Sequence, residues 1–136
     1  MRKKRYSGNV YYPEHLKEPL VLKQGKKQGY DYKILTTGNH PTAYVNLSAS
    51  PYFSTMNLQQ AQNYFMNNSY CLHVHGGITF VGRMGDTEDI WIGWDYMHPN
   101  DFSGVYGTGS RAYTVTDIFE DVKNCIYALS CFGSKY

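Results

Sequence analysis

The segment 114–132 constrains the fold most, because its apolar residues recur at the spacing of an α-helix. They are Val115, Ile118, Phe119, Val122, Ile126 and Leu129, and this spacing places them on one face. Thr114 with Asp117 suits the beginning of such a helix, and Gly133 suits its end. An amphipathic helix is stabilised mainly by packing its apolar face against another element. We therefore expect the rest of the chain to supply a sheet that this helix covers.

Strand-like segments precede this helix. Residues 30–35 and 42–47 are rich in tyrosine and aliphatic residues, as strands are, and a Thr-Gly-Asn-His-Pro turn separates them. Residues 70–81 form a second extended run, which a glycine-containing turn joins to a strand over 89–96. The pattern predicts one short hairpin and one long hairpin over about residues 70–96.

A short helix is predicted over 57–66, with Asn57 as its N-cap. At 136 residues the chain fits a single domain, 1–136, with one hydrophobic core. We predict the α+β class: an antiparallel sheet built around the hairpin at about 70–96, with the C-terminal amphipathic helix, about 114–132, packed on it.

Positive charge is concentrated at the start of the chain, although the net charge is only +2. Residues 1–29 form a basic segment that we expect to be loosely ordered, apart from a short edge strand at Leu20–Leu22. Such an arm suits contact with nucleic acid or an acidic protein, or only solubility. Three cysteines without CxxC spacing, and an N-terminus without an apolar run, indicate a cytoplasmic protein with no membrane association.

The residue types typical of functional sites gather in the predicted long hairpin. Alternate residues of a strand share a face, so His73 and His75 would lie together, with Leu72 and Val74 on the opposite, core face. A register centred near Gly85 would place His75 opposite Asp95. A slip of one residue would invert this assignment.

One interpretation of this set is a metal site. Two neutral imidazoles from one strand and mixed donors from the following loop would suit zinc, manganese or iron. The candidate ligands are His73, His75, Asp95, His98 and Asp101. A histidine opposite an aspartate is also often a plain hydrogen-bonded pair.

A second interpretation is a pocket for a compact polar or anionic ligand such as a nucleotide. Histidines and carboxylates would give directional hydrogen bonds, and Trp94 or Trp91 would give a stacking surface. Paired glycines would let the ligand reach backbone amides, and arginines would contact a phosphate. The candidate residues are His73, His75, Gly76, Gly77, Trp94, Asp95, His98, Asp101 and Arg111, with Arg83 as a second arginine. Either tryptophan would equally suit the core, and the two glycines could mark only a β-bulge.

The segments His73–Phe80 and Trp91–Asp101 resemble an uncharacterised family of small proteins from phages and prophages of Gram-positive bacteria. Those proteins carry a His-Gly-Gly-Leu-Thr-Tyr-like strand, a Trp-Phe-Gly-Phe-Asp-like strand, a His-X-X-Asp step and a C-terminal helix. The resemblance covers about residues 41–131. The matching positions are His75, Gly76, Gly77, Asp95, His98 and Asp101, while Trp94 replaces a typical Phe and Pro99 a typical Ala. The resemblance implies a phage accessory role and assigns no particular reaction.

Three functions follow as hypotheses, because small phage proteins often counter host defence. The first, which we favour, is a binding protein that sequesters a nucleotide signal of the host cell, in a homo-oligomer whose interfaces complete the pocket. The second is a metal-dependent hydrolase of such a nucleotide. The third is an inhibitor of a host defence protein such as a CRISPR nuclease, which would use the basic arm and the tyrosines for contact.

Overall fold

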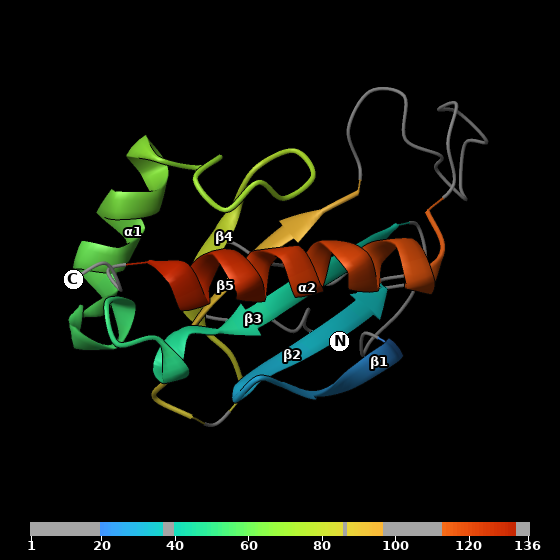
Figure 1. The fold of residues 1–136 in the computed structure, drawn as a ribbon, viewed down its shortest axis with the longest axis horizontal. Helices are drawn as coiled ribbons and strands as arrows, with labels where there is room; N and C mark the ends of the chain where they lie inside the picture. Colours follow the sequence, from blue (N-terminus) through green and yellow to red (C-terminus); the bar gives the residue numbers. More distant parts are fainter. Residues whose placement is uncertain (1–19, 37–39, 86, 97–112, 133–136) are drawn as a thin grey trace, which may run out of the picture.

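The computed structural model describes residues 20–36, 40–85, 87–96 and 113–132. Within these residues the chain forms a five-stranded antiparallel sheet and two α-helices (Figure 1). The strands, in the sheet order β1-β2-β3-β5-β4, are β1 (Leu20–Lys27), β2 (Tyr30–Thr36), β3 (Pro41–Asn46), β5 (Ile90–Asp95) and β4 (Phe80–Arg83). The helices are α1 (Leu58–Asn67) and α2 (Val115–Cys131), with short 3-10 turns η1 (Leu47–Ala49) and η2 (Phe53–Thr55). The predicted α+β class is confirmed.

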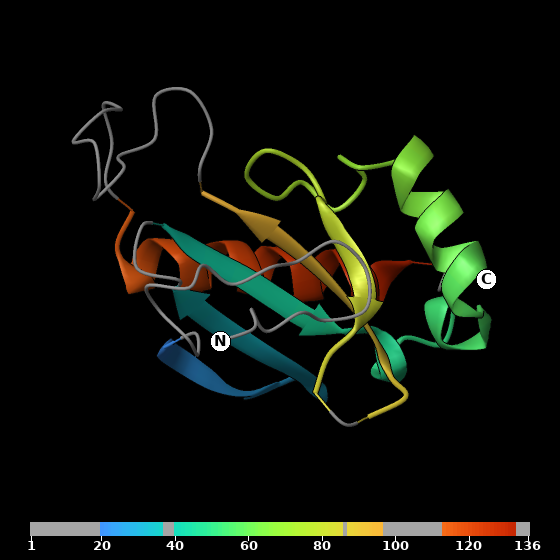
Figure 2. The same ribbon diagram turned by 180° about the vertical axis from the view of Figure 1, so that it is seen from behind.

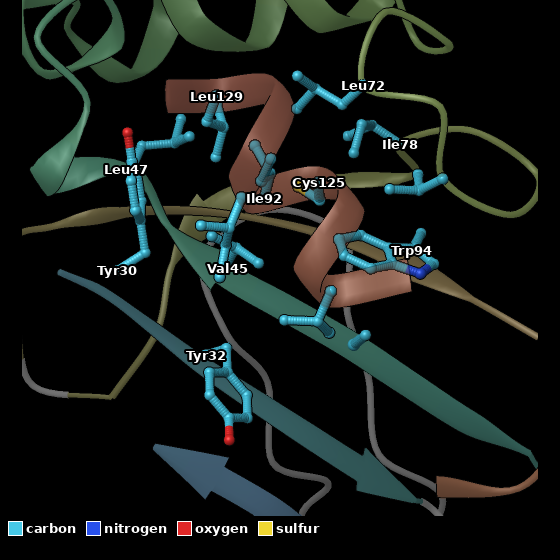
Figure 3. Packing of buried hydrophobic residues seen from close by; sticks show 14 of the residues in the cluster. Tyr30, Tyr32, Val45, Leu47, Leu72, Ile78, Ile92, Trp94, Cys125 and Leu129 are labelled. Atoms are coloured by element: carbon cyan, nitrogen blue, oxygen red, sulfur yellow. The ribbon is translucent and has the colours of Figure 1, made fainter. Parts of the chain in front are cut away.

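Helix α2 lies across one face of the sheet, which we call the front face (Figure 1). Its buried residues are Ile118, Val122, Cys125, Ile126 and Leu129. Alternate residues of the central strands, including Ile34, Val45, Ile92 and Trp94, meet them in the main core (Figure 3). The apolar residues of α2 recur at the helical period and those of the strands at every second position, so the two sets face one another. The helix and the sheet therefore enclose the main core of the fold.

Both helices begin where the sequence predicts. In α2, the Asp117 amide donates to Thr114 Oγ1 and the Thr114 amide donates to Asp117 Oδ2, each at 3.1 Å. Asn57 and Gln60 make the same reciprocal pair at the start of α1. These capping boxes satisfy amides that the first helical turn leaves without partners. The predicted stop at Gly133 lies outside the described residues.

The edge strand predicted at residues 20–22 is longer in the structure, and the prediction of loose order for residues 1–19 falls outside the described residues. Residues 20–27 form the whole of β1, which pairs with β2 through a two-residue turn. Gln28 and Gly29 in that turn have φ of +51° and +87°, as expected for the turn type that suits the twist of a hairpin. The predicted hairpin of β2 and β3 is confirmed, with Ile34 opposite Ala43.

The long hairpin is only partly formed. Strand β4 is four residues long, and its ladder pairs Phe80 with Gly93 and Gly82 with Trp91. Residues 70–79 form successive turns, so the prediction of a strand through His73 and His75 is wrong. His73 has φ of +56°, a left-handed conformation that cannot continue a strand.

Neither helix in the described part of the chain has the length and apolar character required to cross a bilayer.

Candidate functional site

The histidine loop, residues 69–79, connects α1 to β4 beside the end of β5 (Figure 1). Leu72, Val74 and Ile78 are buried in the main core, whereas His73 is exposed and His75 is half-buried. The predicted separation of core and outer residues is therefore correct. Turns rather than a strand produce this separation, because Leu72, Val74 and Ile78 all pack into the core.

Glycine closes this loop. The Ile78 amide donates to the Ser69 carbonyl at 2.7 Å, which brings the two ends together. Gly77 has φ of +82°, and a Cβ there would lie 3.2 Å from Ser69 O and 3.1 Å from Tyr70 Cε1. Gly76 is also left-handed, with φ of +71°. At Gly77, the space that the absent side chain leaves is therefore occupied by Ser69 and Tyr70 of the same loop.

Three aromatic rings meet at His75. Its imidazole stacks on Tyr96, with ring centroids 4.8 Å apart and planes only 4° apart. Tyr113 lies against both rings, at 4.8 Å from His75 and 4.9 Å from Tyr96. The Tyr113 hydroxyl is 3.5 Å from His75 Nδ1. These contacts fix the plane of the imidazole.

A buried hydrogen-bond chain lies beneath this stack. Trp94 Nε1 donates to the Tyr96 hydroxyl at 3.0 Å, and that hydroxyl donates to Asp121 Oδ2 at 2.5 Å. Burial, with the hydrogen bond to Asp121, raises the pKa of Tyr96 far above its ordinary value. Tyr96 is therefore a neutral donor at physiological pH, held between strand β5 and helix α2.

Trp94 is only 1% exposed and belongs to the main core (Figure 3). The prediction that it offers an open stacking surface is therefore wrong. Trp91, the other tryptophan, is also buried, on the opposite face of the sheet.

Asp95 does not lie opposite His75. The ladder places it opposite Thr42, and its Oδ2 accepts a hydrogen bond from Thr79 Oγ1 at 3.1 Å. Since Asp95 sits between Trp94 and Tyr96, whose side chains both belong to the front face, its own side chain points to the rear face. The predicted register is wrong for this reason: the loop turns away before it reaches the end of β5.

The structure does not bring the described candidate metal ligands together. In the described ranges, histidine, cysteine, aspartate and glutamate form no group of three or more suited to a metal ion, so His73, His75 and Asp95 form no such group. His98, Asp101 and Arg111 lie outside the described residues. Arg83 is described and forms an ion pair with Glu88 at 3.4 Å.

A pocket of about 310 Å³ opens where the histidine loop ends. Helix α1 forms one wall and strand β4 the other, and the lining residues are Gln62, Phe65, Met66, Ile78, Thr79 and Val81. Gln62 Nε2 donates to the Val81 carbonyl at 2.9 Å across it. Thr79 brings the Asp95 carboxylate to its edge. The pocket combines apolar walls with a few oriented polar groups, as ligand sites do.

Sequence reasoning did not single out Tyr96, Tyr113, Asp121, Thr79 or Gln62. Their roles depend on contacts between segments distant in the chain, and single-sequence periodicity carries no signal for these. The one available signal was the position of Tyr96, two residues beyond Trp94 and hence on the same face of β5.

No protein-family model matches this chain, and no curated protein or solved structure shows a significant similarity to it.

Proposed function

We propose that the protein binds a compact polar or anionic ligand, such as a nucleotide, in the pocket between α1 and the end of the histidine loop. The single observation that carries this proposal is the size and lining of that pocket, about 310 Å³ between Phe65, Ile78 and Thr79. That volume suits a small ring compound.

The chemistry of the walls supports a ring with polar edges. Phe65, Ile78 and Met66 offer apolar contact to a flat ring. The Thr79 hydroxyl and the Gln62 amide stand on either side, and each is already oriented by a hydrogen bond to Asp95 or to the backbone. Polar groups held in this way select a ligand by direction as well as by size.

In the biological setting that we propose, the protein is a phage accessory protein of the host cytoplasm. It would sequester a nucleotide signal of host defence rather than convert it. The resemblance of residues 41–131 to small phage proteins supports this setting. The proposal needs no metal, consistent with a pocket lined by hydroxyl, amide and apolar groups.

Replacing Thr79 by Val should weaken binding about fivefold, because the net contribution of one hydrogen bond is about 1 kcal/mol. The ligand is identified first, by native mass spectrometry of the protein purified from cells and by a panel of mononucleotides and cyclic mononucleotides. Isothermal titration then compares the variants. Thr116→Val, on the exposed start of α2, is the matched control and should bind normally.

His75→Ala locates the site independently. If the ligand occupies the pocket, this variant should bind within a factor of about three of the unaltered protein. Loss of binding in His75→Ala together with normal binding in Thr79→Val would instead place the ligand at the rings of His75, Tyr96 and Tyr113. A protein that binds none of the panel and carries no ligand from cells would contradict the proposal.

A second candidate function is inhibition of a host defence protein, and the outer edge of β1 favours it. This edge strand has all eight residues exposed, with Leu20 58% exposed beside Val21 and Leu22. Lys23, Lys26 and Lys27 follow on the same strand. Edge strands recruit extended segments of partners, and lysines there favour an acidic one.

An infection assay in a host that carries the defence system separates the two functions. We expect Leu20→Glu with Leu22→Glu to abolish protection of the phage if β1 binds a partner, with nucleotide binding unchanged. Under the favoured function, Thr79→Val reduces protection and the β1 variant retains it. Tyr127→Glu, at an exposed position of α2, is the control for a new surface charge.

A further inference from the structure

The pocket between α1 and the histidine loop has uncharged walls. Strand β4 is the last strand of the sheet, and α1 lies beside it (Figure 2). The described residues that line the pocket are Gln62, Phe65, Met66, Ile78, Thr79 and Val81, and none of them has an ionisable side chain. The carboxylate bonded to this wall is that of Asp95, which accepts from Thr79 Oγ1 at 3.1 Å.

A phosphate group does not suit this interior. On entering, a phosphate would give up water that no cation among the described lining residues replaces. It would also approach the Asp95 carboxylate, which has the same sign of charge. The pocket therefore favours an uncharged part of a ligand, and a phosphate would stay in water outside it.

The hydrogen bonds already made decide what the two polar side chains still offer. Thr79 Oγ1 has one proton, which it donates to Asp95, so toward a ligand this oxygen can only accept. Gln62 Nε2 donates one of its two protons to the Val81 carbonyl, which leaves Oε1 as an acceptor and one N–H as a donor. A hydroxyl that donates to a carboxylate is a better acceptor, because hydrogen bonds in a chain polarise one another. The side chains therefore favour a ligand that brings N–H donors.

The apolar walls suit a flat ring. Phe65 is held by Phe53, with ring centroids 5.1 Å apart and planes 30° apart, and Ile78 belongs to the main core. These side chains form a fixed surface, because neither can turn without disturbing the core. Met66 is 77% exposed, and its flexible thioether can lie over a ring that enters. A volume of about 310 Å³ is near the lower limit of small-molecule sites, which suits one heterocyclic base without its sugar.

We propose that the part of the ligand inside this pocket is an uncharged heterocyclic base with an exocyclic amino group, as in adenine, cytosine and guanine. Its amino group donates to Thr79 Oγ1, and the ring edge beside the amino group meets the remaining donor and acceptor of Gln62. The sugar and any phosphate lie outside. This inference rests on the proposed function of the same pocket and specifies which part of a nucleotide the protein reads.

Bases that carry an oxygen in place of the amino group should be rejected. In hypoxanthine and uracil a carbonyl oxygen takes that position, so it would face the lone pairs of Thr79 Oγ1 with no proton between them. Turning the hydroxyl proton toward the ligand would break its bond to the Asp95 carboxylate. A site arranged to accept from an N–H group discriminates strongly against a ligand that lacks it.

Titration of the full-length chain with pairs of nucleosides tests this selectivity. The pairs are adenosine with inosine, guanosine with inosine, and cytidine with uridine, and the first member of each carries an amino group that the second lacks. Isothermal titration or NMR shifts give the dissociation constants. At least one amino-bearing nucleoside should bind about tenfold more tightly than its partner. The 5′-monophosphate of that nucleoside should bind within about threefold of the nucleoside itself, because its phosphate stays in water.

Two substitutions at one position show whether Thr79 causes the preference. Thr79→Val removes the acceptor and should reduce the preference to within about twofold. Thr79→Ser keeps a hydroxyl that can donate to Asp95, so the preference should remain. Thr116→Val, on α2, is the control for replacing a threonine elsewhere and should bind like the unaltered protein.

Equal binding within every pair overturns the inference and leaves the proposed function standing. A monophosphate that binds more than about tenfold better than its nucleoside overturns it as well, since the protein would then read the phosphate. So does a preference that survives in Thr79→Val, because another group would be responsible. Binding of none of these compounds overturns it too, and a ligand retained from cells in the native mass spectrum then tells whether the proposed function itself holds.

Discussion

Replacing Gly93 by Ala should destabilise the protein by about 3 kcal/mol, the largest effect that we expect from a single added methyl group. A Cβ at this position would lie 2.4 Å from Tyr44 Cδ1 and 3.0 Å from the Ala43 carbonyl oxygen. Tyr44 is held edge-on against Phe80, with centroids 5.5 Å apart, so its ring has little room to move. The main chain of the neighbouring strand cannot move without breaking the ladder. Chemical denaturation measures the loss as a lower midpoint.

A double-mutant cycle distinguishes the cost of steric crowding from a general cost of replacing a glycine in this strand. Tyr44→Ala removes the closest atoms, so Gly93→Ala should cost at least 1 kcal/mol less in that background. Equal costs for Gly93→Ala with and without Tyr44 would show that crowding is not the cause. The Thr79 amide donates to the Gly93 carbonyl, so the same change should also disturb the pocket.

The local signals of the fold were readable in the sequence. Thr114 with Asp117 and Asn57 marked the beginnings of helices correctly, because a capping box involves residues only three apart. The short hairpin of β2 and β3 was readable for the same reason, since its turn and its alternation are adjacent in the chain.

The histidine loop shows where such reasoning fails. The order Leu72, His73, Val74, His75 alternates apolar and polar residues as a strand does. Turns can give the same alternation when the apolar residues anchor in a core. The distinguishing features are the left-handed conformations of His73, Gly76 and Gly77. Glycine permits this conformation without requiring it, and histidine gives no warning of it.

The pocket was not predicted from the sequence. The sequence drew attention to residues 73–77 and to Asp95, whereas the residues that line the pocket are Gln62, Phe65, Met66, Ile78, Thr79 and Val81. Helix α1 supplies one wall of the pocket, Asp121 of α2 bonds Tyr96, and Tyr113 packs on His75. Contacts of this kind are set by the packing of α1 and α2 against the sheet, which no local pattern encodes.

Replacing Tyr96 by Phe should destabilise the protein by about 2 to 3 kcal/mol while the ring stack with His75 is retained. The change deletes only the hydroxyl that accepts from Trp94 Nε1 and donates to Asp121 Oδ2. The indole N–H is then buried without a partner, and a hydrogen bond to a carboxylate is lost. Tyr127→Phe, at an exposed position of α2, is the control and should have no measurable effect. A loss below 0.5 kcal/mol would mean that the chain of bonds does not stabilise the fold.

The same variant should alter how stability depends on pH. The pKa of Tyr96 is raised above its ordinary value of 10.0, because burial and the Asp121 carboxylate disfavour the phenolate. Above pH 10 the unfolded chain releases this proton and the folded chain keeps it, so stability falls as pH rises. Below pH 10 both states hold the proton, and this contribution is constant. Denaturation measured from pH 8 to 11 should therefore show a shallower alkaline decline for Tyr96→Phe than for the unaltered protein. Tyr64 should continue to contribute a decline in both proteins, since burial raises its pKa to about 12.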